Sequence, residues 1–120
     1  MASKQEFLQG KYNSLKAKYN ELESFYYKNF KMVPKNSDTR LITTRDYYLE
    51  STHCAKEQFE VLHRQFKAAL AEALEALESY KSGWFSDKEY AADAQWRIGL
   101  FTKDSESILY HLEHFELRLK

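Results

Sequence analysis

The feature that most constrains the fold is a run of apolar residues at alternating intervals of four and three positions near the start of the chain. The run consists of Leu8, Tyr12, Leu15, Tyr19, Leu22 and Tyr26. At about 100° per residue, side chains with this spacing fall on one face of an α-helix. Half of them are tyrosines, which suit a bundle of three or more helices better than the narrow core of a dimeric zipper. The pattern predicts a helix over residues 3–31.

Two later segments repeat this spacing, and residues that stop a helix precede each of them. Pro34 and the polar residues after it interrupt the first pattern, and Gly83 interrupts the second. The repeated positions are Tyr48, Thr52, Ala55, Phe59, Leu62, Phe66, Ala69, Ala73, Leu77 and Tyr80 in the second segment, and Tyr90, Ala94, Ile98, Phe101, Ser105, Ile108, Leu112, Phe115 and Leu119 in the third. We expect helices over about 40–81 and 86–119, with Gly99 bending the third helix rather than ending it.

These segments place the chain in the all-α class. Three helices joined by short links must alternate in direction, and the spacing of their apolar positions calls for low crossing angles. The chain has three glycines and one proline, too few for a fold that turns about every ten residues. We therefore predict a single domain over residues 1–120, an elongated antiparallel three-helix bundle with coiled-coil-like packing.

The composition indicates a cytoplasmic protein. Cys54 is the single cysteine, so no internal disulfide can form. The first residues lack the apolar run of a signal peptide. No window of the sequence reaches the roughly 18 to 20 apolar residues of a transmembrane helix. We expect no membrane association, and a location in a host cytoplasm if a phage encodes the chain.

The reactive side chains form no catalytic pattern. Glu50 with His53, and Glu60 with His63, have the Glu-x-x-His spacing of di-metal bundles, but such sites draw ligands from several helices and both pairs fall on one predicted helix. His53 and Cys54 are adjacent and point about 100° apart on a helix, which prevents the imidazole from activating the thiol. We expect a protein that is not an enzyme and has no cofactor and no metal site; a metal-binding bundle ranks as the third interpretation.

The third segment carries a second apolar stripe on the side away from its predicted core face. The stripe consists of Trp96, Leu100, Tyr110, His114 and Leu117. An outer helix of a three-helix bundle should be polar there, and exposed tryptophan and tyrosine are favoured anchors of protein interfaces. Either the third helix is the middle one and buries this stripe, or the stripe binds a protein partner or a second copy of the chain. We favour the interface, together with Trp84 and Phe85 in the preceding link.

A protein-interaction module is the function that these residues favour, acting as an adaptor, an assembly factor or a stoichiometric inhibitor such as a phage-encoded regulator of a host protein. The alternative is a nucleic-acid-associated accessory protein. Residues 1–45 contain nine Lys and Arg and four acidic residues, and their lysines alternate with tyrosines. This combination is typical of proteins that bind single-stranded nucleic acid. The isoelectric point of about 6.9 argues against a nucleic-acid binder, so this interpretation ranks second.

Overall fold

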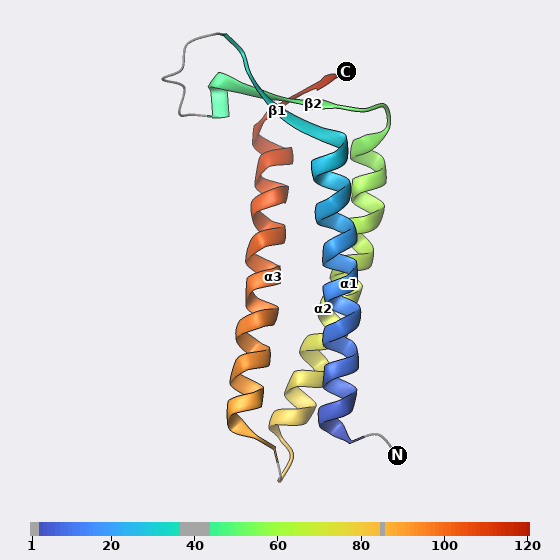
Figure 1. Cartoon of the computed structure of the whole chain (residues 1–120), viewed down its shortest axis with the longest axis vertical. Coiled ribbons are helices and arrows are strands. Elements are labelled where there is room, and N and C mark those ends of the chain that lie inside the picture. Colours follow the sequence, from blue (N-terminus) through green and yellow to red (C-terminus); the bar gives the residue numbers. More distant parts are fainter. Residues whose placement is uncertain (1–2, 37–43, 85) are drawn as a thin grey trace.

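The computed structural model describes residues 3–36, 44–84 and 86–120. The helices are α1 (Lys4–Asn29), α2 (Ala55–Lys81) and α3 (Lys88–His114), the strands are β1 (Phe30–Pro34), β2 (Tyr47–Ser51) and β3 (Glu116–Leu119), and a short 3-10 helix, η1 (Thr44–Asp46), precedes β2. The molecule is elongated, with extents of 59 × 29 × 16 Å. The three helices run along the long axis in alternating directions, and the strands cross one end of the bundle (Figure 1).

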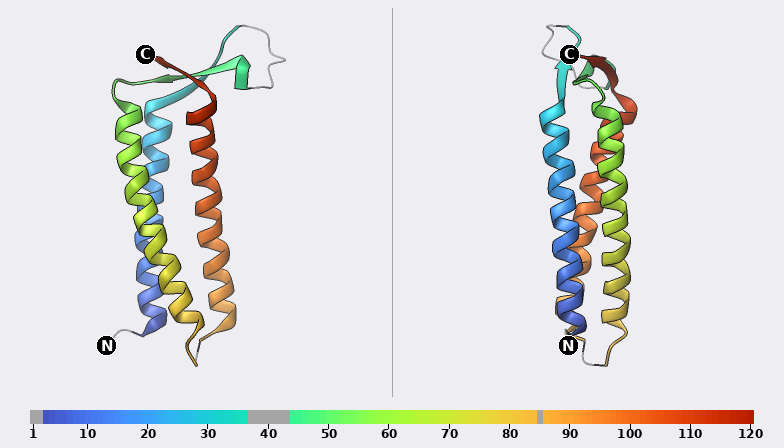
Figure 2. Two further views of the ribbon diagram at one scale, coloured as in Figure 1. Left: turned by 180° about the vertical axis from the view of Figure 1, so that it is seen from behind. Right: turned by 90° about the vertical axis from the view of Figure 1, so that its right-hand side faces the viewer.

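The strands form a mixed sheet in which β2 is central. β1 pairs with β2 in the antiparallel sense, and β3 pairs with β2 in the parallel sense. Each strand adjoins a different helix, because β1 continues from α1, β2 leads toward α2 and β3 follows α3. The sheet therefore joins three helix ends at one end of the molecule, as the two views of Figure 2 show.

The prediction of an all-α fold is wrong, because about 75% of the described residues are helical and about 13% form strands. The largest error lies in the helix predicted over 40–81. Residues 47–51 form β2 instead, and α2 begins only at Ala55. Cys54, just before α2, has a φ of 60°, which belongs to the left-handed region and is incompatible with a continuing right-handed helix. A turn at this point separates β2 from α2.

The other two helices end earlier than predicted. α1 ends at Asn29 rather than at residue 31, and α3 ends at His114 rather than at residue 119, because β1 and β3 follow them. The physical cause is backbone pairing: both short segments find partners for their N–H and C=O groups in β2. α3 is continuous through Gly99, in agreement with the prediction of one third helix.

The repeated apolar positions meet along the axis of the bundle. All three leucines of the first pattern are inaccessible to solvent. From α2 and α3 the core takes Ala55, Phe59, Phe66, Ala69, Ala73, Leu77, Tyr80, Ala94, Ile98, Ile108 and Leu112. Leu62 and Phe101, expected in the core, are half-buried at its margin, and Leu119 is 69% exposed. The pattern therefore locates most of the core within the helices, and of the pattern positions after α3, Phe115 is buried whereas Leu119 is exposed.

One face of the sheet completes this core. Leu49 of β2 is fully buried, and the register places Leu117 of β3 beside it. The next row contains Glu50 and Arg118 with Lys31 opposite, and successive rows of a sheet point to opposite faces. The sheet thus has an apolar face toward the bundle and a charged face away from it.

Candidate functional site

Four side chains of the second apolar stripe lie exposed on the outside of α3. We call Trp96, Leu100, Tyr110 and His114 the α3 outer face. The exposed fractions are 63% for Trp96, 39% for Leu100 and 49% for Tyr110, and His114 is exposed as well. Core residues of the same helix such as Ile98 are buried. The interpretation in which α3 is the middle helix and buries this stripe is therefore excluded.

Tyr110 and His114 form a rigid flat surface near the sheet end of α3. Their rings stack with centroids 3.9 Å apart and an angle of 18° between the ring planes. The Nδ1 atom of His114 lies 2.9 Å from the carbonyl oxygen of Tyr110. Because a carbonyl only accepts, Nδ1 carries the proton, and Nε2 of the neutral ring is left as an acceptor. The hydrogen bond and the stacking both favour this orientation of the His114 ring, which lowers the entropic cost of binding.

Leu117 does not belong to this face. It lies on β3 opposite Leu49 and is half-buried against the core. α3 ends at His114, so the helical spacing that aligned Leu117 with Tyr110 does not apply beyond that point. Period-two alternation in the segment ELRL was the sequence signal that distinguishes a strand here.

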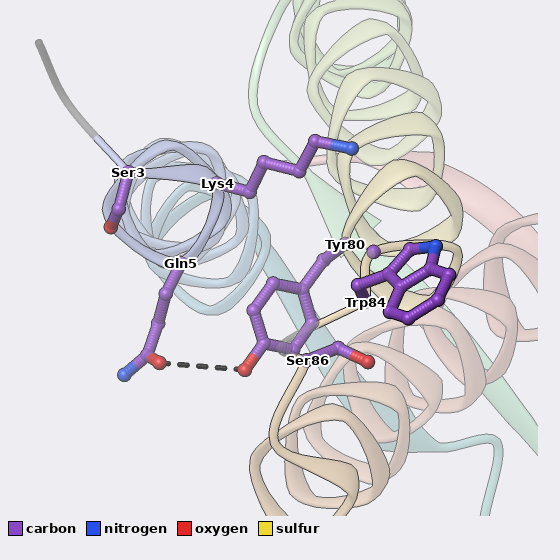
Figure 3. Close-up of a pocket in the computed structure, with 7 residues that line it drawn as sticks. Ser3, Lys4, Gln5, Tyr80, Trp84 and Ser86 are labelled. Carbon is purple, nitrogen blue, oxygen red and sulfur yellow. Dashed lines mark hydrogen bonds between the residues drawn. The ribbon is translucent and has the colours of Figure 1, made fainter.

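Trp84 lies at the opposite end of the bundle, in the link between α2 and α3. Its side chain is 96% exposed and borders a cavity of about 380 Å³ whose other lining residues include Lys4 and Tyr80 (Figure 3). The hydroxyl of Tyr80 accepts from the backbone N–H of Asp87 at 2.8 Å and donates to Gln5 at 3.4 Å. Phe85, predicted beside Trp84 as a contact residue, lies outside the described residues.

Carboxylates border the α3 outer face. Glu106 and Glu113 lie four residues before and three residues after Tyr110, so both are its neighbours on the helix surface. Both are exposed, and neither forms an ion pair within the part of the chain that the structure describes. Asp93, near Trp96, is paired with Arg97 at 3.0 Å. The sheet end of this face therefore carries two exposed carboxylates, and the exposed Lys103 lies three residues before Glu106.

The tyrosines of the basic first helix are largely core groups. Tyr19 and Tyr26 are each 6% exposed, and burial is the main cause that raises the pKa of both hydroxyls. The hydroxyl of Tyr26 lies 3.2 Å from Nδ1 of His111 and links α1 to α3. Tyr27 is 70% exposed. The buried tyrosines are therefore not platforms on which nucleic-acid bases can stack.

The histidines and the cysteine are dispersed. Over residues 3–36, 44–84 and 86–120, no three His, Cys, Asp or Glu side chains gather in a way that could hold a metal ion. His63 lies beside two phenylalanines of α2, with ring centroids 6.1 Å from Phe59 and 6.4 Å from Phe66. Burial, and secondarily the charge of Lys67, lowers its pKa. Cys54 is exposed.

The lowered pKa of His63 predicts a loss of stability in mild acid. The unfolded chain binds a proton at the ordinary pKa of histidine, whereas folded His63 resists protonation until a lower pH. His63 therefore contributes to the free energy of unfolding at neutral pH, and this contribution falls as the pH drops below about 6.5. In urea titrations at pH 7.5 and pH 5, His63→Gln should lose less stability between the two conditions than the parent protein. An equal loss in both would show that another group causes the pH dependence.

No helix in the described part of the chain combines the length and apolarity needed to cross a membrane. Comparisons of the chain with protein-family models, with curated proteins and with solved structures found no match.

Proposed function

We propose that the protein is a non-enzymatic interaction module whose α3 outer face binds a partner protein. The observation that carries this proposal is the exposure of Trp96, Leu100 and Tyr110 on one side of a helix whose other side is packed into the core. Exposed large apolar groups in a line do not stabilise a lone bundle, and they favour association. Tryptophan and tyrosine are also the residues most enriched among strong contributors to protein binding.

The geometry of this face suits a protein partner better than a small ligand. The four side chains extend from Trp96 to His114, about 27 Å along a helix at 1.5 Å per residue. The cavity beside Trp84 lies at the link end of the bundle, and its lining contains none of these four residues. A long convex helix surface matches the contact made by another helix or by an apolar groove. Binding there would block or bridge a partner, which is the action of a stoichiometric inhibitor, an adaptor or an assembly factor.

The charges around the α3 outer face indicate which charges the surface of the partner should carry. Glu106 and Glu113 flank the stacked pair of Tyr110 and His114 without an ion pair of their own among the described residues. Lysine or arginine side chains on the partner would compensate them. The expected partner surface is therefore apolar at its centre and basic along one side, and raised salt should slow association.

The test is a double substitution, Trp96→Ala with Leu100→Ser. Both side chains are exposed, so the helix content should stay close to that of the parent protein. An interface aromatic contributes about 2 kcal/mol or more to binding, which corresponds to roughly a thirtyfold loss of affinity. Tagged protein is used to capture its partner from an extract of the organism that encodes it, and recovery is quantified against the parent.

Val61→Ala with Leu74→Ser is the matched control, because these two α2 side chains are each 44% exposed and lie outside the α3 outer face. A protein lost with the α3 variant and kept with the α2 variant supports the proposal. Equal recovery of the same proteins by both variants contradicts it. Salt-sensitive recovery of nucleic acid by both variants would instead favour the basic first helix.

A further inference from the structure

The two outer edges of the sheet differ in the backbone groups they expose. At the β1 edge, hydrogen bonds from Lys35 to Asp46 and from Thr52 to Asn29 show that the odd-numbered residues of β1 face β2. The even-numbered residues therefore face outward. Of these outward residues, Phe30 donates its N–H to the carbonyl oxygen of Tyr26 at the end of α1, and Pro34 has no N–H. Within β1, only Met32 therefore offers a free N–H at this edge. Its outward carbonyl oxygens remain as acceptors, but with a single donor the edge is less suited to strand pairing, and we call it the closed edge.

The β3 edge is open. The N–H of Lys120 donates to the carbonyl oxygen of Ser51 at 2.9 Å, and the register is parallel with Leu117 opposite Leu49 and Leu119 opposite Ser51. Residues of even number in β3 therefore bond to β2, and those of odd number point their N–H and C=O groups away from it. Leu117 and Leu119 together present two donors and two acceptors at the outer edge. The side chain of Leu119 is 69% exposed.

The sequence of this strand is complementary to itself in the antiparallel sense. If a second β3 pairs with Leu117 opposite Leu119 of the other copy, all four outward backbone groups of each strand are used. The same register sets Glu116 opposite Lys120 of the other copy, two charges of opposite sign, although Glu116 is also paired with Lys35 of its own chain at 3.2 Å. It also sets the two Arg118 residues opposite each other.

The arginines are compatible with this register because each is already compensated within its own chain. Arg118 donates to both carboxylate oxygens of Glu116, at 3.0 and 3.2 Å. Its guanidinium also lies 4.2 Å from the ring centre of Tyr48 on β2. Its charge is therefore directed toward its own sheet and away from the edge.

We propose that the outer edge of β3 is a dimerisation edge, on which a second copy of this chain adds its own β3 to form one continuous sheet of six strands. A two-fold axis through the pair of Arg118 residues makes the contact closed and symmetric, so it stops at two copies. This surface is separate from the α3 outer face, and the dimer would present two such faces to partners.

Disulfide trapping tests the register. Opposed residues between hydrogen-bonded pairs of antiparallel strands have Cα atoms about 4.5 Å apart, a distance that a disulfide can span. In a Cys54→Ser background, Arg118→Cys should form a covalent dimer under mild oxidation. Glu116→Cys and Met32→Cys are matched controls, the first on β3 but facing Lys120 of the other copy and the second on the closed edge. Circular dichroism verifies that each variant is folded.

Light scattering of the unmodified chain over a concentration series supplies a readout without substitutions. If β3 is the dimerisation edge, the measured mass approaches twice that of the chain. Leu119→Pro, which removes an outward N–H, should reduce the mass to that of the monomer. Trp96→Ala with Leu100→Ser should leave the mass unchanged. Monomer at every concentration would overturn the proposal. So would cross-linking of the Arg118→Cys variant no faster than that of the Met32→Cys variant, or loss of the dimer in the α3 variant.

Discussion

Truncation of Phe66 to alanine should lower the free energy of unfolding by about 3–5 kcal/mol. Phe66 is 1% exposed and its ring lies 6.0 Å from that of Tyr19 on α1, so the substitution leaves a cavity between two helices. Urea denaturation followed by circular dichroism measures the loss, and the slope against urea concentration should not change if the folded and unfolded states keep their compactness.

Phe101 is the informative comparison for Phe66. The sequence pattern predicts that both residues lie in the core, but in the structure Phe101 is half-buried against Tyr12 and Tyr19. Phe101→Ala should therefore cost clearly less than Phe66→Ala, because part of the lost surface was never removed from water. Equal losses at the two positions would contradict the placement of Phe101 at the margin of the core.

Leu49→Ala should be the most damaging change in the sheet, with a loss of about 2–5 kcal/mol in the free energy of unfolding. Leu49 is fully buried and lies on the central strand, with Met32 on one side and Leu117 on the other. Thermal unfolding compared with Leu74→Ala measures this effect, since Leu74 is 44% exposed and its truncation should change stability by only about 0.5 kcal/mol. If the two variants have the same stability, the sheet does not pack on the bundle as described.

The helical core could be predicted from the sequence because its signal is local. Residues such as Leu15, Phe59 and Ile108 recur at helical spacing, and each of them is buried. The pattern requires no knowledge of which helix packs against which. It follows from the geometry of a single helix and the free energy of burying apolar side chains.

The sheet could not be predicted in the same way because its signal is non-local. The segment YYLES has no helix-breaking residue, and Tyr48 and Thr52 fit the helical spacing that continues through Ala55 and Phe59. What selects a strand is the pairing of β2 with β1 and with β3. The left-handed backbone at Cys54 marks the boundary between β2 and α2, and a cysteine does not indicate this backbone conformation in a sequence.

The outer face of α3 was predictable in part. Trp96, Leu100, Tyr110 and His114 are exposed on one side of the helix, as expected for an interface, whereas Leu117 is half-buried in the sheet. The open edge of β3 was not among the predicted surfaces. Alternation in the segment from Glu116 to Lys120 was its signal, but an edge exists only once the other strands of the sheet are placed.

The parallel pairing of β2 with β3 also bears on the order in which the molecule assembles. Ser51 and Arg118 are 67 positions apart in the chain, and α2, the link and α3 all lie between them. Their contact closes a long loop and carries a large entropic cost until the two helices lie side by side. The helices α2 and α3 can pack against each other progressively from their short link toward the sheet, because the contacts near the link join residues that are close in sequence. We therefore expect the pairing of β2 with β3 to form after α2 and α3 have packed together.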